Sequence, residues 1–81
     1  MHVTIRLFAR LRELAGASEL HRQIAEGATA RDAWNDLVKE FAALEPYGTA
    51  ISCAVNETYA KLTTELRDGD EVAFLPPVSG G

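Results

Sequence analysis

Residues 30–44 constrain the fold of this 81-residue chain most strongly, because they alone have the apolar pattern of a long amphipathic helix. Thr29 stands at the N-cap position and Asp32 follows three residues later, as in a capping box. Pro46 ends the pattern. The apolar stripe, which we expect in the core, consists of Ala30, Ala33, Trp34, Leu37, Val38, Phe41 and Leu44. One helix with a single wide apolar face requires a broad apolar surface to pack against, such as a β-sheet.

Five short segments predict the strands of such a sheet. They are residues 3–8, 18–24, 51–56, 59–61 and 72–75. The first alternates apolar and polar side chains, whereas the second is weaker and suits an edge strand. Residues 9–16 are typical of either a turn of helix or an ordered loop. The predicted order is therefore β-β-α-β-β-β, an α+β domain in which about five strands carry one main helix on one face.

Alternation along the strands predicts two different faces of the sheet. If the first and last strands lie side by side, the helix covers Val3, Ile5, Leu7, Val72 and Phe74. The opposite face then carries Phe8, Ala54, Tyr59, Ala73 and Leu75. Several apolar side chains gathered on an open face are typical of a protein interface. The alternative is that Phe8 and Tyr59 only cap a loop locally.

The C-terminal residues predict a tail that leaves the domain. Pro76 and Pro77 end the last strand, because proline cannot donate to a sheet ladder, and together they favour an extended stalk. We therefore divide the chain into a domain of residues 1–77 and a flexible tail of residues 78–81. This tail, Val78, Ser79, Gly80 and Gly81, is thin enough to enter a narrow channel. Its carboxylate is inert until an enzyme activates it, for example as an acyl-adenylate. The alternative is an ordinary frayed terminus.

Composition argues against several other functions. The formal net charge is −4, and no basic cluster is present, which argues against nucleic acid and anionic membranes as partners. We find no membrane-spanning stretch or signal peptide, and a single cysteine fits a reducing cytoplasm. His2 and His21 lack the spacing of metal ligands, and Cys53 is typical of a small core residue. We therefore expect no bound metal or cofactor, and no catalytic group in residues 1–77.

Three stretches resemble the small subunit of molybdopterin synthase, the MoaD type of sulfur carrier. They are FARLRELAG at residues 8–16, AVNET at 54–58 and DGDEVAFLPPVSGG at 68–81. The resemblance covers essentially the whole chain and implies a ubiquitin-like β-grasp fold with a mixed sheet. It also implies that an ATP-dependent, MoeB-like activating enzyme adenylates Gly81, which a sulfur donor protein then converts to a thiocarboxylate.

The same resemblance implies how the carrier works with its partner. The tail enters the active site of a large synthase subunit, and two such sulfurs build the dithiolene of molybdopterin. The implied assembly has two small and two large subunits, and the small subunit donates sulfur without being the catalyst. The implied contact with the large subunit is made by Phe8, Tyr59, Ala73, Leu75, Pro76 and Pro77.

Three other functions stay open at this point. A ubiquitin-like protein modifier would pass Gly81 to a target lysine, and a thiamin-type sulfur carrier would use the same activation. A plain interaction domain would use the apolar sheet face and leave the tail idle.

Overall fold

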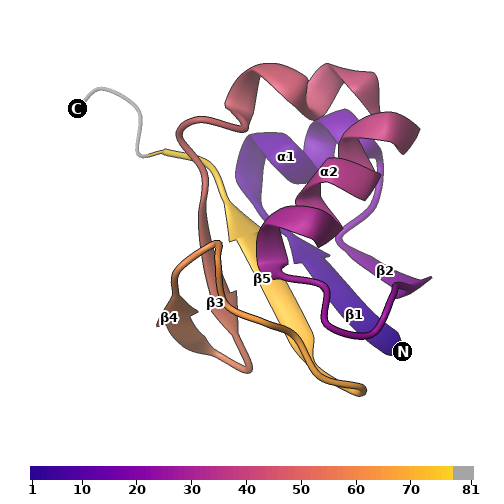
Figure 1. The fold of residues 1–81 in the computed structure, drawn as a ribbon. Helices are drawn as coiled ribbons and strands as arrows, with labels where there is room; N and C mark the ends of the chain where they lie inside the picture. Colours follow the sequence, from indigo (N-terminus) through magenta and orange to yellow (C-terminus); the bar gives the residue numbers. More distant parts are fainter. Residues whose placement is uncertain (78–81) are drawn as a thin grey trace.

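A five-stranded mixed sheet with helices on one side forms the domain in the computed structural model, which describes residues 1–77 (Figure 1). The strands are β1 (His2–Leu7), β2 (Glu19–Gln23), β3 (Ser52–Val55), β4 (Thr58–Ala60) and β5 (Glu71–Leu75), and their order in the sheet is β2-β1-β5-β3-β4. The helices are α1 (Ala9–Ala15), α2 (Ala30–Glu40) and the 3₁₀ helix η1 (Ala42–Tyr47). The predicted α+β class, with its main helix on one face of the sheet, is confirmed.

The first and last strands lie side by side in the sheet, which is the condition on which the assignment of its two faces rested. β1 and β5 are parallel, with Ile5 opposite Val72 and Leu7 opposite Phe74, whereas every other neighbouring pair is antiparallel. Figure 1 shows both arrows pointing the same way. Because parallel strands end at the same edge of a sheet, Phe8 and Pro76 leave the sheet together at that edge.

The core fills the space between the helices and the inner face of the sheet. Val3, Ile5 and Leu7 of β1 and Val72 and Phe74 of β5 are all buried there, as the alternation predicted. From α2, the ring of Trp34 meets that of Phe74 edge to face, with 5.2 Å between centroids. Leu11 of α1 and Leu44 of η1 also reach the core. The assignment of the two faces is therefore correct.

The main helix begins where the sequence predicted and ends earlier. Thr29 and Asp32 form both hydrogen bonds of a capping box. The expected end at Leu44 is wrong, because α2 stops at Glu40 and Phe41 leaves the helical conformation. The ring of Pro46 would clash only with the carbonyl of Ala42, four residues earlier, so Pro46 does not explain an end at Glu40. The chain instead continues after Phe41 as the tighter helix η1, which contains Pro46. The bend leaves Leu44 fully buried and Phe41 only half-buried.

The segment after β1 is a true helix rather than an ordered loop. α1 ends at Gly16, which adopts a left-handed conformation (φ 72°) and donates its N–H to the carbonyl of Arg12. Glycine reaches this conformation without steric strain, so the predicted stop is confirmed. Leu11 points inward and holds this helix against the core.

A tight turn joins β3 to β4 and is attached to the start of β5. Asn56 and Glu57 both have positive φ, at 51° and 70°, as two-residue hairpin turns require. The Asn56 side chain accepts a hydrogen bond from the backbone N–H of Glu71 and donates one to the Asp70 carboxylate, both at 2.9 Å. This side chain thus stabilises the turn and fixes the register between β3 and β5.

Replacing Asn56 should therefore destabilise the domain. Asn56→Ala removes two hydrogen bonds and places alanine in a left-handed conformation, which we expect to lower the free energy of unfolding by about 1–3 kcal/mol. Urea denaturation measures the change. Glu57→Ala is the matched control, because it keeps a side chain at positive φ and changes no hydrogen bond found in residues 1–77. Equal effects of the two substitutions would contradict the role given to Asn56.

Candidate functional site

The sheet face opposite the helices contains an open hollow of about 370 Å³. Its lining consists of Arg6, Phe8, Ala54, Glu57, Tyr59, Glu71, Ala73 and Leu75. All five apolar residues that the strand pattern assigned to this face are among them. The structure thus brings together Phe8, Tyr59, Ala73 and Leu75, which the sequence suggested as interface residues, while their contact with a partner stays a prediction.

The hollow exists because the central strands carry small residues on this face. Ala73 of β5 lies opposite Ala54 of β3 on one side and Arg6 of β1 on the other, and Ala54 lies opposite Tyr59 of β4. A single row across four strands therefore has two alanines in its middle and long side chains at both ends. The alanines form a low floor between taller walls.

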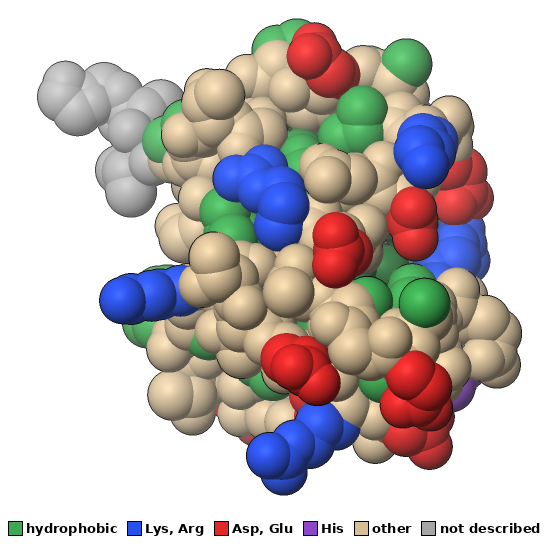
Figure 2. Space-filling view, in the orientation of Figure 1, with side chains coloured by type: hydrophobic (Ala, Val, Ile, Leu, Met, Phe, Trp, Pro, Cys, Tyr) green, Lys and Arg blue, Asp and Glu red, His purple; other side chains and the backbone are tan. Residues whose placement is uncertain are grey.

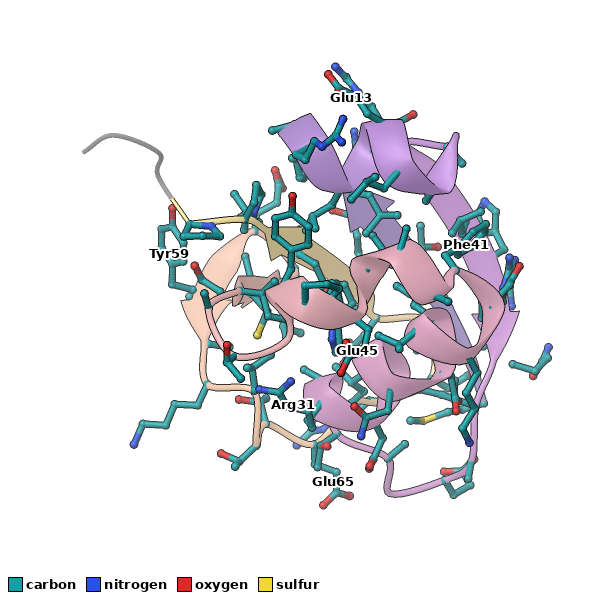
Figure 3. All side chains as sticks on the ribbon, turned by 90° about the horizontal axis from the view of Figure 1, so that it is seen from above. Glu13, Arg31, Phe41, Glu45, Tyr59 and Glu65 are labelled. Carbon is teal, nitrogen blue, oxygen red and sulfur yellow. The ribbon has the colours of Figure 1, made fainter. Side chains whose placement is uncertain are left out.

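Aromatic rings form the most exposed apolar part of these walls. Phe8 is 39% exposed and Tyr59 is 78% exposed, so both residues are accessible to a partner. Figure 3 shows Tyr59 at the edge of the sheet, pointing away from the helices. Large rings around an apolar floor are typical of protein interfaces, where they bury much area with little loss of entropy. The alternative that these two rings cap a loop does not explain why both line one hollow.

Phe8 and Leu75 place the hollow next to the start of the tail. Leu75 is half-buried at the end of β5, and it is followed by half-buried Pro76 and exposed Pro77. Neither proline lines the hollow, although both leave the sheet at its edge. The predicted tail, Val78–Gly81, lies outside the described residues, so its proposed role stays a prediction.

Three charged residues that line the hollow were not singled out from the sequence as interface residues, namely Arg6, Glu57 and Glu71. Arg6 Nη1 lies 3.8 Å from Glu71 Oε2, and the guanidinium carbon lies 5.9 Å from the centroid of the Phe8 ring. Alternation did place Arg6 on the same face as Phe8. The proximity of Glu71 depends on the register of β1 against β5, which the strand pattern alone does not define.

Metal-ligating and nucleophilic side chains were also sought outside the hollow, in residues 1–77. No group of three or more His, Cys, Asp or Glu side chains in this part of the chain is placed to hold a metal ion. Cys53 is buried in β3, where its thiol lies 3.3 Å from the Ala60 carbonyl. Burial raises the pKa of the Cys53 thiol, which keeps it protonated and unreactive near neutral pH.

Charge on the helical side of the molecule is mixed. Figure 2 shows acidic and basic side chains interspersed there rather than gathered in one basic patch. Within residues 1–77, no helix is both long and apolar enough to cross a membrane.

Comparison with curated proteins gives full-length relatives. A molybdopterin synthase sulfur carrier subunit from Arabidopsis thaliana is 35% identical over 81 residues, covering 100% of this chain and 84% of that protein. A protein of the same name from Escherichia coli K12 is 35% identical, covering 98% of this chain and 99% of its own length. The resemblance found in the sequence is therefore confirmed.

Solved structures share the fold. SAMP1 from Haloferax volcanii superposes with a TM-score of 0.87 at 35% identity, and each chain is covered completely. A putative molybdopterin converting factor subunit 1 from Pyrococcus furiosus gives a TM-score of 0.84 at 34% identity, covering 96% of this chain and 99% of that one. These matches confirm the ubiquitin-like β-grasp fold. The model of the ThiS family matches residues 5–81, so the chain belongs to the ThiS family.

Proposed function

We propose that this protein is the sulfur carrier subunit of a molybdopterin synthase. The observation that carries the proposal is the parallel pairing of β1 with β5, which places the apolar hollow beside the two prolines that lead into the tail. A partner seated on the hollow would have the tail at the margin of its contact surface. The names of the full-length relatives from plants and bacteria support the same function.

The chemistry of the proposal takes place at Gly81. On the activating enzyme, a carboxylate oxygen of Gly81 attacks the α-phosphorus of ATP and releases pyrophosphate, which gives an acyl-adenylate. A persulfide of the donor protein then attacks the acyl carbon and displaces AMP, which gives an acyl disulfide. A thiol attacks the donor's sulfur of this disulfide, so that the thiocarboxylate is released and a disulfide remains on the donor. The thiocarboxylate is the nucleophile that delivers sulfur to the dithiolene, while the partner supplies acid, base and oxyanion groups. In this scheme the carrier is a non-catalytic subunit with no cofactor of its own.

The partners of the proposal follow from this chemistry. The large synthase subunit receives the tail, in an assembly of two small and two large subunits, and a MoeB-like enzyme and a sulfur donor protein load it. A related chain from Helicobacter pylori, 26% identical with a TM-score of 0.67 and complete coverage of both chains, has been solved in a complex of subunits 1 and 2 of molybdopterin-converting factor. We also propose a cytoplasmic location, which agrees with the single cysteine, Cys53.

A second candidate is a ubiquitin-like protein modifier. The likeness to SAMP1 favours it, since a solution structure from Methanosarcina acetivorans, 32% identical with a TM-score of 0.82 and covering 99% of this chain and 96% of that one, names that protein small archaeal modifier protein 1. Both functions require activation of Gly81, and they differ in the product. A carrier yields a thiocarboxylate, whereas a modifier yields an isopeptide bond to a lysine. A thiamin-type carrier would make the thiocarboxylate for a different acceptor.

Loading of the tail is the direct test of these alternatives. Incubation with a MoeB-like enzyme, ATP and a sulfur donor should exchange one oxygen of the Gly81 carboxylate for sulfur, as intact-mass spectrometry would show. A known carrier treated in parallel verifies that the enzymes are active. Unchanged mass beside a loaded control would refute the sulfur-carrier function, and conjugates to lysines of other proteins would favour the modifier.

The shape of the tail gives a second test. Gly80→Val, or one residue added after Gly81, should abolish synthase activity, because a side chain or a displaced carboxylate would not fit a narrow channel. Thermal unfolding should be almost unchanged, since the tail follows the folded domain. A coupled synthase assay and a thermal melt measure the two effects. Full activity of the extended protein would show that the free carboxylate of Gly81 is not the working group.

The hollow itself gives a third test. Leu75→Glu should weaken binding to the large subunit by about tenfold to a hundredfold, because the carboxylate would be desolvated without a partner. The monomer should stay folded, because Val72 and Phe74 make the core contacts of β5. Calorimetric titration measures the affinity and circular dichroism checks the fold. Ala43→Glu, an exposed position in η1 on the other side of the sheet, is the matched control. Normal binding by a folded Leu75→Glu protein would exclude this face as the interface.

A further inference from the structure

Arg6 is the only cation among the eight residues that line the hollow. Its Nε atom is buried and has no hydrogen-bond partner in residues 1–77. The nearest carboxylate, that of Glu71, lies 3.8 Å from Nη1, which is too long for a hydrogen bond. Glu19 lies opposite Arg6 on β2, but its Oε2 atom contacts Nε2 of His21 at 3.1 Å. The guanidinium therefore keeps unused donors.

This position of Arg6 does not favour the stability of the isolated domain. A buried N–H group without an acceptor is unfavourable, and an exposed ion pair such as that with Glu71 contributes little. A leucine at this position would continue the apolar wall formed by Phe8. The contact with the Phe8 ring, at 5.9 Å, is the other interaction of the guanidinium within the domain, and at an exposed site it too contributes little.

Covering the hollow would change the surroundings of Arg6. The side chain is 43% exposed, so water still solvates part of the guanidinium in the free protein. A purely apolar partner surface would remove that water and leave a charged group with too few acceptors, which costs more than the contact with Glu71 returns. A partner carboxylate would satisfy the guanidinium donors that face solvent, because a guanidinium forms paired hydrogen bonds with a carboxylate.

We propose that Arg6 is a partner-recognition residue, and that the protein surface seated on the hollow presents an aspartate or glutamate to its guanidinium. The inference rests on the proposed function, in which that surface belongs to the large subunit of molybdopterin synthase. The apolar residues then supply contact area, while the Arg6 ion pair fixes the orientation and selects among partners. Glu71 contacts Arg6 from one side and leaves the remaining donors for the partner.

The proposal predicts opposite effects of one substitution on stability and on binding. Arg6→Leu should have a melting temperature equal to or above that of the unchanged protein, yet bind the large subunit at least about tenfold more weakly. Its affinity should also depend less on NaCl concentration, because one ion pair is missing from the complex. Arg6→Gln, which keeps a polar side chain and loses the charge, should show the same weakening. Calorimetric titrations over a series of NaCl concentrations measure the affinity and its salt dependence, and thermal unfolding measures the melting temperature.

Further variants distinguish failure of the Arg6 proposal from failure of the proposed function. Lys39→Leu removes one positive charge from α2, on the far side of the sheet, and should leave binding unchanged. Unchanged affinity of Arg6→Leu and Arg6→Gln would overturn the proposal, and tighter binding would show that an apolar or basic surface covers Arg6. Failure of the unchanged protein to bind the large subunit would instead contradict the proposed function. A charge swap would identify the partner residue. If Arg6→Glu loses binding, replacing the contacting aspartate or glutamate of the large subunit by arginine should restore it.

Discussion

The parallel pairing of β1 with β5 is the interaction on which the rest of the structure depends. It joins residues near the two ends of the chain at the centre of the sheet, with Ile5 opposite Val72 and Leu7 opposite Phe74. The remaining strands then add on either side, β2 beside β1 and β3 followed by β4 beside β5. Because the two central strands run the same way, the aromatic side chain after β1 and the prolines after β5 meet at one edge. Binding surface and tail are thus neighbours as a consequence of topology.

The open face results from the one-sided packing of the main helix. α2 and the core lie on one side of the sheet, and within residues 1–77 the hollow on the other side stays open. The apolar surface at the centre of the exposed face is small, because Ala54 and Ala73 have short side chains. Charged residues line the same hollow beside these alanines. Such a face is compatible with a free monomer in water and retains an apolar floor that a partner can cover.

Much of this arrangement could be predicted from the sequence, because each face of a strand repeats every second residue. That period correctly separated buried Phe74 from half-buried Leu75 and placed Phe8 on the outer face. The end of the main helix could not be predicted in the same way, since the break at Phe41 depends on how η1 packs. The contact of Arg6 with Glu71 also needed the structure, because strand register is a tertiary property. The roles of Val78–Gly81 rest on the sequence and its relatives.

The central position of β5 has a mechanical consequence. A partner that draws the tail into a channel pulls on the C-terminal end of this strand, which has hydrogen-bonded neighbours on both sides. A pull along the strand would act on its hydrogen bonds to β1 and to β3 at the same time. These bonds would then have to break together rather than one after another. The inward-facing side chains of Val72 and Phe74 would have to leave the core in the same movement. Separating β5 from the sheet therefore requires these hydrogen bonds and core contacts to break together.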